Sequence, residues 1–280
     1  MRIDLHTHSV YSDGMLTPAA LIERAVLREV STLALTDHDE MGGLGEACLA
    51  ARDRGVRLIS GVEISVSWRS QTIHVVGLDL DPAHVPLAQG LAGLRDGRRL
   101  RALKISEQLE TAGLLDPADN LVSDSVHRGA LGRGHFARAL AASGRAKNPA
   151  DAFKRFLAQG KAGYVDHVWA ELGQAVAWIR GAGGFAILAH PERYRISRPV
   201  AKALWDEFKH CGGHAIEICR DDPGVAAEQI RSARCLGFML SGGSDFHGPG
   251  AGSADLGDVA SIDSDPAAVW LHEDFGRHCH

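Results

Sequence analysis

The chain has 280 residues, a formal net charge of −5 and a hydrophobic content of 45%. This length permits one large hydrophobic core, and the charge argues against tight binding of long nucleic acid, which needs many phosphate contacts. We therefore expect no DNA partner. No apolar run approaches the roughly 18 residues of a membrane-spanning helix, so we expect no membrane partner either. The five cysteines contain no CxxC pair, which argues against a disulfide framework and predicts reduced thiols in a cytoplasmic protein.

The predicted elements alternate between strands and helices. In chain order they are a strand at 3–5, a helix that begins at Pro18, a strand at 33–35, a helix over about 42–54, strands at 56–62 and 72–78, and later strands at 184–188 and 237–240. Thr17 before Pro18 is typical of a helix start, and Gly55 is typical of a helix end. This alternation predicts an α/β fold with a parallel sheet, and at this length a barrel rather than an open sheet.

The stretch over 84–165 breaks this rhythm. It is helix-forming, richer in charge and without a convincing β-branched run. We expect an inserted helical subdomain between two barrel segments, residues 1–83 and 166–280. A long surface excursion without a core of its own is the alternative.

Histidines and acids follow most of the apolar runs. The segments are His6-Thr7-His8 with Asp13, Asp37-His38-Asp39, Glu63, His74, His190-Pro191 and Ser244-Asp245-Phe246-His247. Imidazole and carboxylate are the ligands that Zn²⁺, Mn²⁺ and Fe²⁺ accept. A single histidine at a strand end is more often structural, and Asp37 or Asp39 equally suits a loop cap. The whole set, at the strand ends where barrel enzymes place their active sites, predicts a hydrolytic metal centre.

These motifs resemble those of the PHP (polymerase and histidinol phosphatase) family. The similarity rests on Asp4-Leu5-His6-Thr7-His8-Ser9, Ala34-Leu35-Thr36-Asp37-His38-Asp39, Gly61-Val62-Glu63-Ile64-Ser65, His190-Pro191 and Gly243-Ser244-Asp245-Phe246-His247-Gly248. The resemblance implies a distorted (β/α)₇ TIM-like barrel with a centre of two or three metal ions that hydrolyses phosphoesters.

The resemblance also implies a set of metal ligands. Two ions are expected on His6, His8, Glu63, His74, His190 and Asp245, with Glu63 bridging. A third ion, or the substrate phosphate, is expected on Asp13, His38 and His247. Some family members carry histidine at the position of Asp13, so occupancy of the third site stays open. Manganese is the expected metal, with zinc and iron as alternatives that the same ligands accept.

The chemistry of such a centre agrees with these residue types. Two cations about 3.5–4 Å apart hold a hydroxide for attack on phosphorus and neutralise the phosphoryl oxygens. The leaving oxygen needs a proton, for which His38 and His247 are the candidates. We favour His247, because Asp13 and Asp37 are expected to hold His38 in place. The residues expected to act in catalysis are Glu63, His38, His247 and Asp13.

The predicted insert carries two basic groups. One contains Arg98, Arg99 and Arg101, and the other contains Arg133 and His135. A solvated helix face is the commoner explanation of such runs. Their order, however, resembles a PHP subgroup of 3′,5′-nucleoside bisphosphate phosphatases and 5′-to-3′ exoribonucleases. That resemblance implies that these five residues bind a substrate phosphate, which guanidinium groups match well.

The resulting hypothesis is a metal-dependent phosphoesterase. Its expected substrate is a small nucleotide such as 3′-phosphoadenosine 5′-phosphate, or the 5′ end of short RNA. A histidinol-phosphate phosphatase is one alternative, and it would favour acidic contacts to an amine over an arginine cluster. A non-catalytic PHP scaffold module is another, although no metal ligand is missing here. A related amidohydrolase would need a ligating lysine, and none follows a predicted strand at a suitable position.

Overall fold

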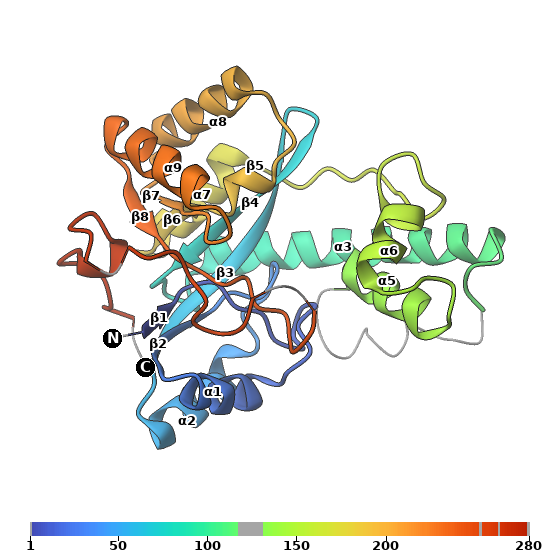
Figure 1. The fold of residues 1–280 in the computed structure, drawn as a ribbon, viewed down its shortest axis with the longest axis horizontal. Helices are drawn as coiled ribbons and strands as arrows, with labels where there is room; N and C mark the ends of the chain where they lie inside the picture. Colours follow the sequence, from blue (N-terminus) through green and yellow to red (C-terminus); the bar gives the residue numbers. More distant parts are fainter. Residues whose placement is uncertain (1, 117–130, 252–253, 263, 279–280) are drawn as a thin grey trace.

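The computed structural model describes residues 2–116, 131–251, 254–262 and 264–278. Within these residues a curled eight-stranded sheet is covered by helices on its outer face (Figure 1). The strands follow the order β1-β2-β3-β4-β6-β7-β8, and a short β5 pairs with β3. Among the described residues, no helix is long and apolar enough to cross a membrane.

The strands are β1 (Arg2–Asp4), β2 (Val30–Leu35), β3 (Arg57–Trp68), β4 (Gln71–Leu78), β5 (Ala170–Glu171), β6 (Phe185–Leu188), β7 (Ala215–Glu217) and β8 (Met239–Ser241). The α-helices are α1 (Pro18–Leu27), α2 (Leu44–Arg54), α3 (Val85–Thr111), α5 (Arg133–Ala142), α6 (Pro149–Ala152), α7 (Leu172–Gly181), α8 (Arg198–His210) and α9 (Pro223–Cys235). Three short helical turns are η2 (Phe153–Leu157), η3 (Pro191–Arg193) and η4 (Val269–Leu271).

The ends of the first two helices follow from local chemistry. The hydroxyl of Thr17 accepts the backbone N–H of Ala20, and Pro18 begins α1, as the sequence predicted. Gly55 ends α2 in the left-handed conformation, with φ 68°, which costs glycine little.

One strand departs from the predicted parallel sheet. β4 runs antiparallel to both β3 and β6, whereas the other neighbours on the sheet path are parallel. The reason is local, because only Arg69 and Ser70 separate β3 from β4, and parallel strands need a crossover of a dozen or more residues. β3 also continues to Trp68, so the prediction that a strand ends at Glu63 was wrong.

The curl of the sheet is visible in its interior packing. One buried cluster contains Ile3 and Leu5 together with Ile59, Ile187 and Ala215. These side chains come from β1 and the residue after it, β3, β6 and β7, which only a curled sheet brings into a single cluster. Backbone hydrogen bonds also join the segments that follow β1 and β8: Leu5 N donates to Gly242 O (3.1 Å), Asp245 N to His6 O (2.9 Å) and His8 N to Phe246 O (2.9 Å).

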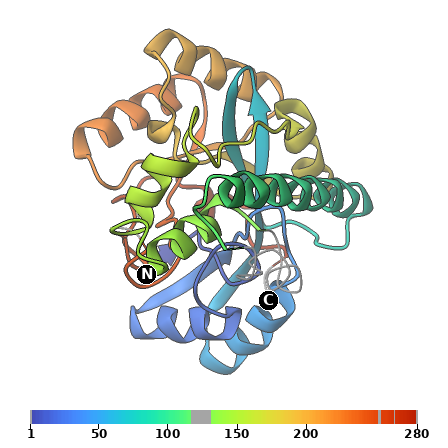
Figure 2. The same ribbon diagram turned by 90° about the vertical axis from the view of Figure 1, so that its right-hand side faces the viewer.

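The described residues between β4 and β5 form a helical lobe that projects from the sheet (Figures 1 and 2). α3, α5, α6 and η2 share a buried cluster that includes Ile105, Leu109, Phe136 and Leu157. The first half of α3 packs instead on the sheet, where Leu87 belongs to the main core. α3 therefore connects the two regions. Residues 117–130, inside the predicted insert, lie outside the described residues.

The end of β4 anchors the last described residues of the chain. Asp79 is buried, has a φ of 53°, and its carboxylate accepts the backbone N–H groups of Gly276, Arg277 and His278 at 2.6–3.0 Å. Phe275, just before them, joins the interior cluster. Because β4 is antiparallel, this anchor lies at the edge of the sheet where the parallel strands begin.

Replacing Asp79 with alanine should therefore destabilise the chain. The change removes three part-buried hydrogen bonds to a buried carboxylate, which we expect to cost about 1–3 kcal/mol in free energy of unfolding. Asp79→Asn keeps one carbonyl oxygen and tolerates the left-handed backbone, so it should lose less. Urea unfolding followed by circular dichroism measures both variants. An alanine variant as stable as the wild type would contradict the anchoring role.

Candidate metal centre

Two histidines after β1 point to the same side because they are two residues apart in extended chain. The intervening Thr7 points the other way, where its hydroxyl donates to Ala34 O at 2.6 Å and its N–H donates to Thr36 Oγ1 at 3.0 Å. His6 and His8 are both almost fully buried. The backbone thus presents two imidazoles at one edge of the curled sheet.

Glu63 and His74 come together through the β3–β4 hairpin. Val76 lies opposite Glu63, and Ser65 lies opposite His74, so all four side chains share one face of the sheet. This face is the inner one, because Val76 belongs to the interior cluster. Neither residue stands at a strand end, and their proximity results from pairing rather than from converging loops.

Glu63 lies at the middle of the cluster and has no exposed surface. Its Oε1 is 2.8 Å from His74 Nδ1 and 3.0 Å from His190 Nε2. Its Oε2 is 2.8 Å from His38 Nδ1 and 3.3 Å from the Nε2 atoms of both His6 and His8. The two oxygens therefore face different sets of histidines.

The loop after β8 contributes to the same cluster. Asp245 Oδ1 is 3.1 Å from His8 Nε2 and 3.4 Å from His6 Nε2. The backbone is strained at Asp245 and at His190, with φ of 53° and 29°. Such strain in residues other than glycine persists only where the surroundings enforce it, and it gathers at functional sites.

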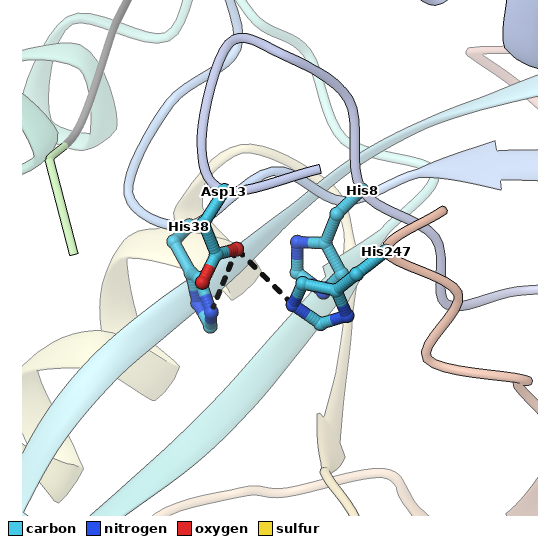
Figure 3. Close-up of side chains that lie close together, drawn as sticks. All are labelled: His8, Asp13, His38 and His247. Carbon is cyan, nitrogen blue, oxygen red and sulfur yellow. Dashed lines mark ion pairs between the residues drawn. The ribbon is translucent and has the colours of Figure 1, made fainter. Parts of the chain in front are cut away.

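A further group surrounds Asp13, as Figure 3 shows. Asp13 Oδ1 lies between His247 Nε2 at 3.1 Å and His38 Nε2 at 3.7 Å. His8 stacks on His247, with ring centroids 4.1 Å apart, and thereby belongs to both this group and the group around Glu63. The structure thus brings together all nine residues that the sequence singled out as metal ligands or third-site residues.

The donor atoms of this cluster are arranged as a metal site requires. Three groups of side chains could each hold a metal ion, because the potential ligand atoms within each group lie within 4.8 Å of one another. The groups are His6, His8, Glu63 and Asp245; His38, Glu63 and His74; and His8, Asp13, His38 and His247. Several buried atoms in them lack a hydrogen-bond partner, namely His6 Nε2, Asp13 Oδ1, His38 Nδ1, Glu63 Oε2 and His74 Nδ1. Buried polar atoms are rarely left so, and a shared cation satisfies them together.

The charges of the cluster favour cations as well. Burial opposes ionisation of Glu63, but His38 and His74 outweigh it and hold the pKa of Glu63 well below its usual value. Burial also opposes the charge of His247, but Asp13 above all raises the pKa of His247 to about 10. The carboxylates therefore stay ionised at neutral pH beside positive charge from the imidazoles, and divalent cations would supply that charge when the histidines bind them as neutral rings.

Glu217 is a functional residue that sequence reasoning missed. Its Oε2 lies 2.7 Å from His6 Nδ1, on the side of the ring that faces away from Glu63, and both side chains are buried. Metal-ligating histidines usually donate their second ring N–H to such a carboxylate, which fixes the tautomer and the ring orientation. The signal in the sequence was only an acid after the short apolar pair Ala215-Ile216.

Two other carboxylates hold the loops that carry the cluster. Asp37 accepts Ser9 N, Ser9 Oγ and Ser12 Oγ at 2.6–2.7 Å, which corresponds to the loop-capping alternative. Asp4 accepts the backbone N–H groups of Ser244 at 2.9 Å and Gly257 at 2.8 Å. These contacts fix the loop after β1 against the loops after β2 and β8.

Arg98 of the insert is engaged with the protein itself. It is buried, its Nε donates to Asp39 Oδ2 at 2.6 Å, and its Nη2 donates to Ser65 Oγ at 2.5 Å. Asp39 follows His38 directly and has a φ of 52°. Arg98 therefore ties α3 to the strained loop that presents His38.

The other predicted phosphate-binding residues lie in different surroundings. Arg101 donates to Val165 O at 3.0 Å, and Arg133 stacks over a phenylalanine ring. The ring of His135 accepts the backbone N–H of Gly132, and the helix start that carries it, α5, packs against Asp13. Arg99 is exposed. The structure thus brings His135 near Asp13, groups Arg101 with Arg133 and leaves Arg99 at the surface.

Removal of the Glu217 carboxylate should weaken metal binding. Glu217→Ala leaves the outer ring nitrogen of His6 without its partner, so we expect the affinity for the divalent metal to fall about 10- to 100-fold. Glu217→Gln retains an oxygen that accepts the N–H and should lose less. Competition titration with a metal indicator measures both, with exposed Glu228→Ala as control. Unchanged affinity in Glu217→Ala would exclude the role.

Known proteins resemble this chain over most of its length. Residues 4–213 match the PHP domain. A 3′,5′-nucleoside bisphosphate phosphatase of Chromobacterium violaceum is 43% identical over 270 residues, which is 96% of this chain and 95% of the relative. A 5′-3′ exoribonuclease of Haemophilus influenzae is 38% identical over 96% of this chain and 98% of that relative.

Solved structures agree with these matches. A protein of Chromobacterium violaceum, described as an amidohydrolase with bound sulfate, has a TM-score of 0.89 at 42% identity and covers 96% of this chain and 93% of its own. A metal-dependent phosphoesterase of Bifidobacterium adolescentis has a TM-score of 0.84 at 27% identity, covering 94% of this chain and 93% of its own. The family predicted from the motifs is thereby confirmed: the chain belongs to the PHP domain family.

Proposed function

We propose that the chain is a metal-dependent phosphoesterase that removes a phosphate from a small nucleotide, such as a 3′,5′-nucleoside bisphosphate, or trims the 5′ end of short RNA. The observation that carries the proposal is the position of Glu63, a buried carboxylate whose two oxygens face different sets of histidines. That arrangement suits a bridge between two cations. The activities of the phosphatase and exoribonuclease relatives support the substrate class.

In this proposal the first ion is held by His6, His8, Glu63 and Asp245, and the second by Glu63, His74 and His190. Asp13, His38 and His247 hold a third ion or contact the phosphate. When bound, two such ions acidify a water molecule and neutralise the phosphoryl oxygens. Manganese is the proposed metal, with zinc and iron as alternatives that histidine and carboxylate also bind.

The side chains around the ions have separate tasks. His6 is held in orientation by Glu217, and the backbone N–H of Asp245 donates to His6 O, which holds the loop after β8 against the segment after β1. His247 is the proposed proton donor to the leaving oxygen. Its Nε2 faces Asp13, and its Nδ1 lies 2.9 Å from Asp245 O, so the ring is held from both sides.

The basic residues of the insert fit an anionic substrate. Burial, together with the nearby Arg133 and Arg98, lowers the pKa of Arg101 to about 10. Like charges held this close are unfavourable unless an anion joins them, and phosphate is the anion that guanidinium groups match. A histidinol phosphate would bring an amine, for which this cluster is unsuited. We therefore propose the insert as a substrate-binding subdomain.

The closure of the sheet and the cellular location complete the proposal. The backbone hydrogen bonds between the segments after β1 and β8 support closure of the curled sheet into a distorted (β/α)₇ barrel. The described cysteines, Cys48, Cys211, Cys219 and Cys235, are free thiols, which supports a cytoplasmic location.

Glu63→Gln should abolish the reaction and leave the fold intact. The amide preserves the size of the side chain but not the charge that two cations share, so phosphate release should fall by about 10³-fold or more. Release from a nucleoside bisphosphate after reconstitution with manganese measures the effect, and circular dichroism checks folding. The matched control is Glu228→Gln on the surface. Rates close to wild type in the Glu63 variant would refute the proposal.

Alanine at Arg101 or Arg133 should mainly raise KM. Each change removes a cation from the proposed phosphate contact while the metal ligands stay in place, so KM should rise by about tenfold with a smaller change in kcat. Lys104→Ala, an exposed cation of the same helix, is the control. Arg99→Ala should have less effect than Arg101→Ala, because Arg99 is exposed. A larger rise in KM for Arg99→Ala than for Arg101→Ala would favour the phosphate-binding role that the sequence predicted for Arg99.

A further inference from the structure

A cavity of about 300 Å³ lies beside the metal cluster and is independent of the insert. Its walls come from the loops that follow β6, β7 and β8, and the described residues of the insert contribute nothing to its lining. Asp245 and His247, which belong to the cluster, form part of the wall, so the cavity opens directly onto the metal centre.

Arg193 links this cavity to the centre. Its Nη1 donates to Asp245 Oδ2, the carboxylate oxygen that faces away from the histidines, and nearly half of its side chain is exposed. Glu192 Oε1 lies 3.7 Å from Arg193 Nε and offsets part of its charge. Arg193 therefore connects the wall of the cavity to Asp245, a proposed metal ligand.

Arg220 supplies the second cation of the wall. Its side chain is only 15% exposed, whereas its partner Asp221, at 2.8 Å, is 59% exposed. Arg220 is therefore held in the wall, and Asp221 and Asp245 line the same cavity beside the two guanidinium groups. A polar cavity with two guanidinium groups is a typical recognition site for a phosphate group.

We propose that this cavity is a phosphate subsite for a nucleotide chain that continues beyond the phosphate being cut. The inference rests on the proposed function and narrows it. In the proposed function, Arg101 and Arg133 of the insert bind the one remaining phosphate of a bisphosphate. A second basic site, at Arg193 and Arg220, matches a substrate with phosphates on both sides of the scissile one, which is an oligonucleotide.

The test compares two ligands on the manganese-loaded full chain. One is a 5′-phosphorylated trinucleotide with phosphorothioate linkages, which hydrolyse slowly, and the other is a nucleoside 3′,5′-bisphosphate. Arg220→Ala should raise the Kd of the trinucleotide by about tenfold, the scale of one lost charge-assisted contact, and that of the bisphosphate by clearly less. It should also reduce the slope of log Kd against log salt for the trinucleotide by about 0.7.

Matched variants separate the site from general effects. Arg198→Ala removes a cation of α8 that is 88% exposed and should change neither ligand. Arg220→Lys keeps the charge and should recover part of the trinucleotide affinity. If the alanine variant does not fold, Arg220→Gln provides the same comparison with a smaller change in packing.

The outcomes are distinguishable. If Arg220→Ala loses the same affinity for both ligands, the cavity binds a phosphate that the bisphosphate also carries, and the proposal is overturned. If Arg220→Ala binds both ligands with wild-type affinity, the cavity is not a phosphate subsite. A wild-type chain that turns over neither ligand's natural counterpart would refute the proposed function, whereas the Kd and salt comparison would still decide the subsite.

Discussion

The arrangement of the candidate metal centre depends on one carboxylate without exposed surface, that of Glu63. Burying Glu63 is unfavourable unless positive charge surrounds it, and the fold supplies imidazoles from β4 and from the loops after β1, β2 and β6. Much of the remaining polar interior, from Glu217 behind His6 to Asp37 beneath the first loop, orients those imidazoles. The cluster of candidate metal ligands and the hydrophobic core therefore depend on the same strands, because the strands that enclose the apolar interior also determine where the ligands meet.

The sequence predicted the helix ends that depend only on neighbouring residues. The Thr17-Pro18 start of α1 and the Gly55 end of α2 need no distant partner, and both were correct. The direction of β4 was missed, because apolar runs alone do not give strand direction, although the two-residue connection of Arg69 and Ser70 contained that information. Glu217 was missed because its strand has three residues and its partner, His6, lies at the other end of the chain.

The arginines of the insert illustrate the same limit. Helical spacing placed Arg98 and Arg101 on one side of α3, and both are indeed at least partly buried. Their surroundings differ because the carboxylate of Asp39, a residue from a distant loop, pairs with Arg98, whereas Arg101 donates to Val165 O. A charge pattern identifies a basic face, but the contacts across the interface decide which cations hold the protein together and which stay available to a ligand.

The antiparallel hairpin of β3 and β4 has a consequence for how the chain folds. Glu63 and His74 meet through a tight turn, so this half of the cluster requires only a short loop to close. The contact between His8 and Asp245 spans 237 residues of sequence and carries a much larger entropic penalty. The hairpin is therefore suited to form early as a nascent half-site, and the joining of the two chain ends around it would be a late step of folding.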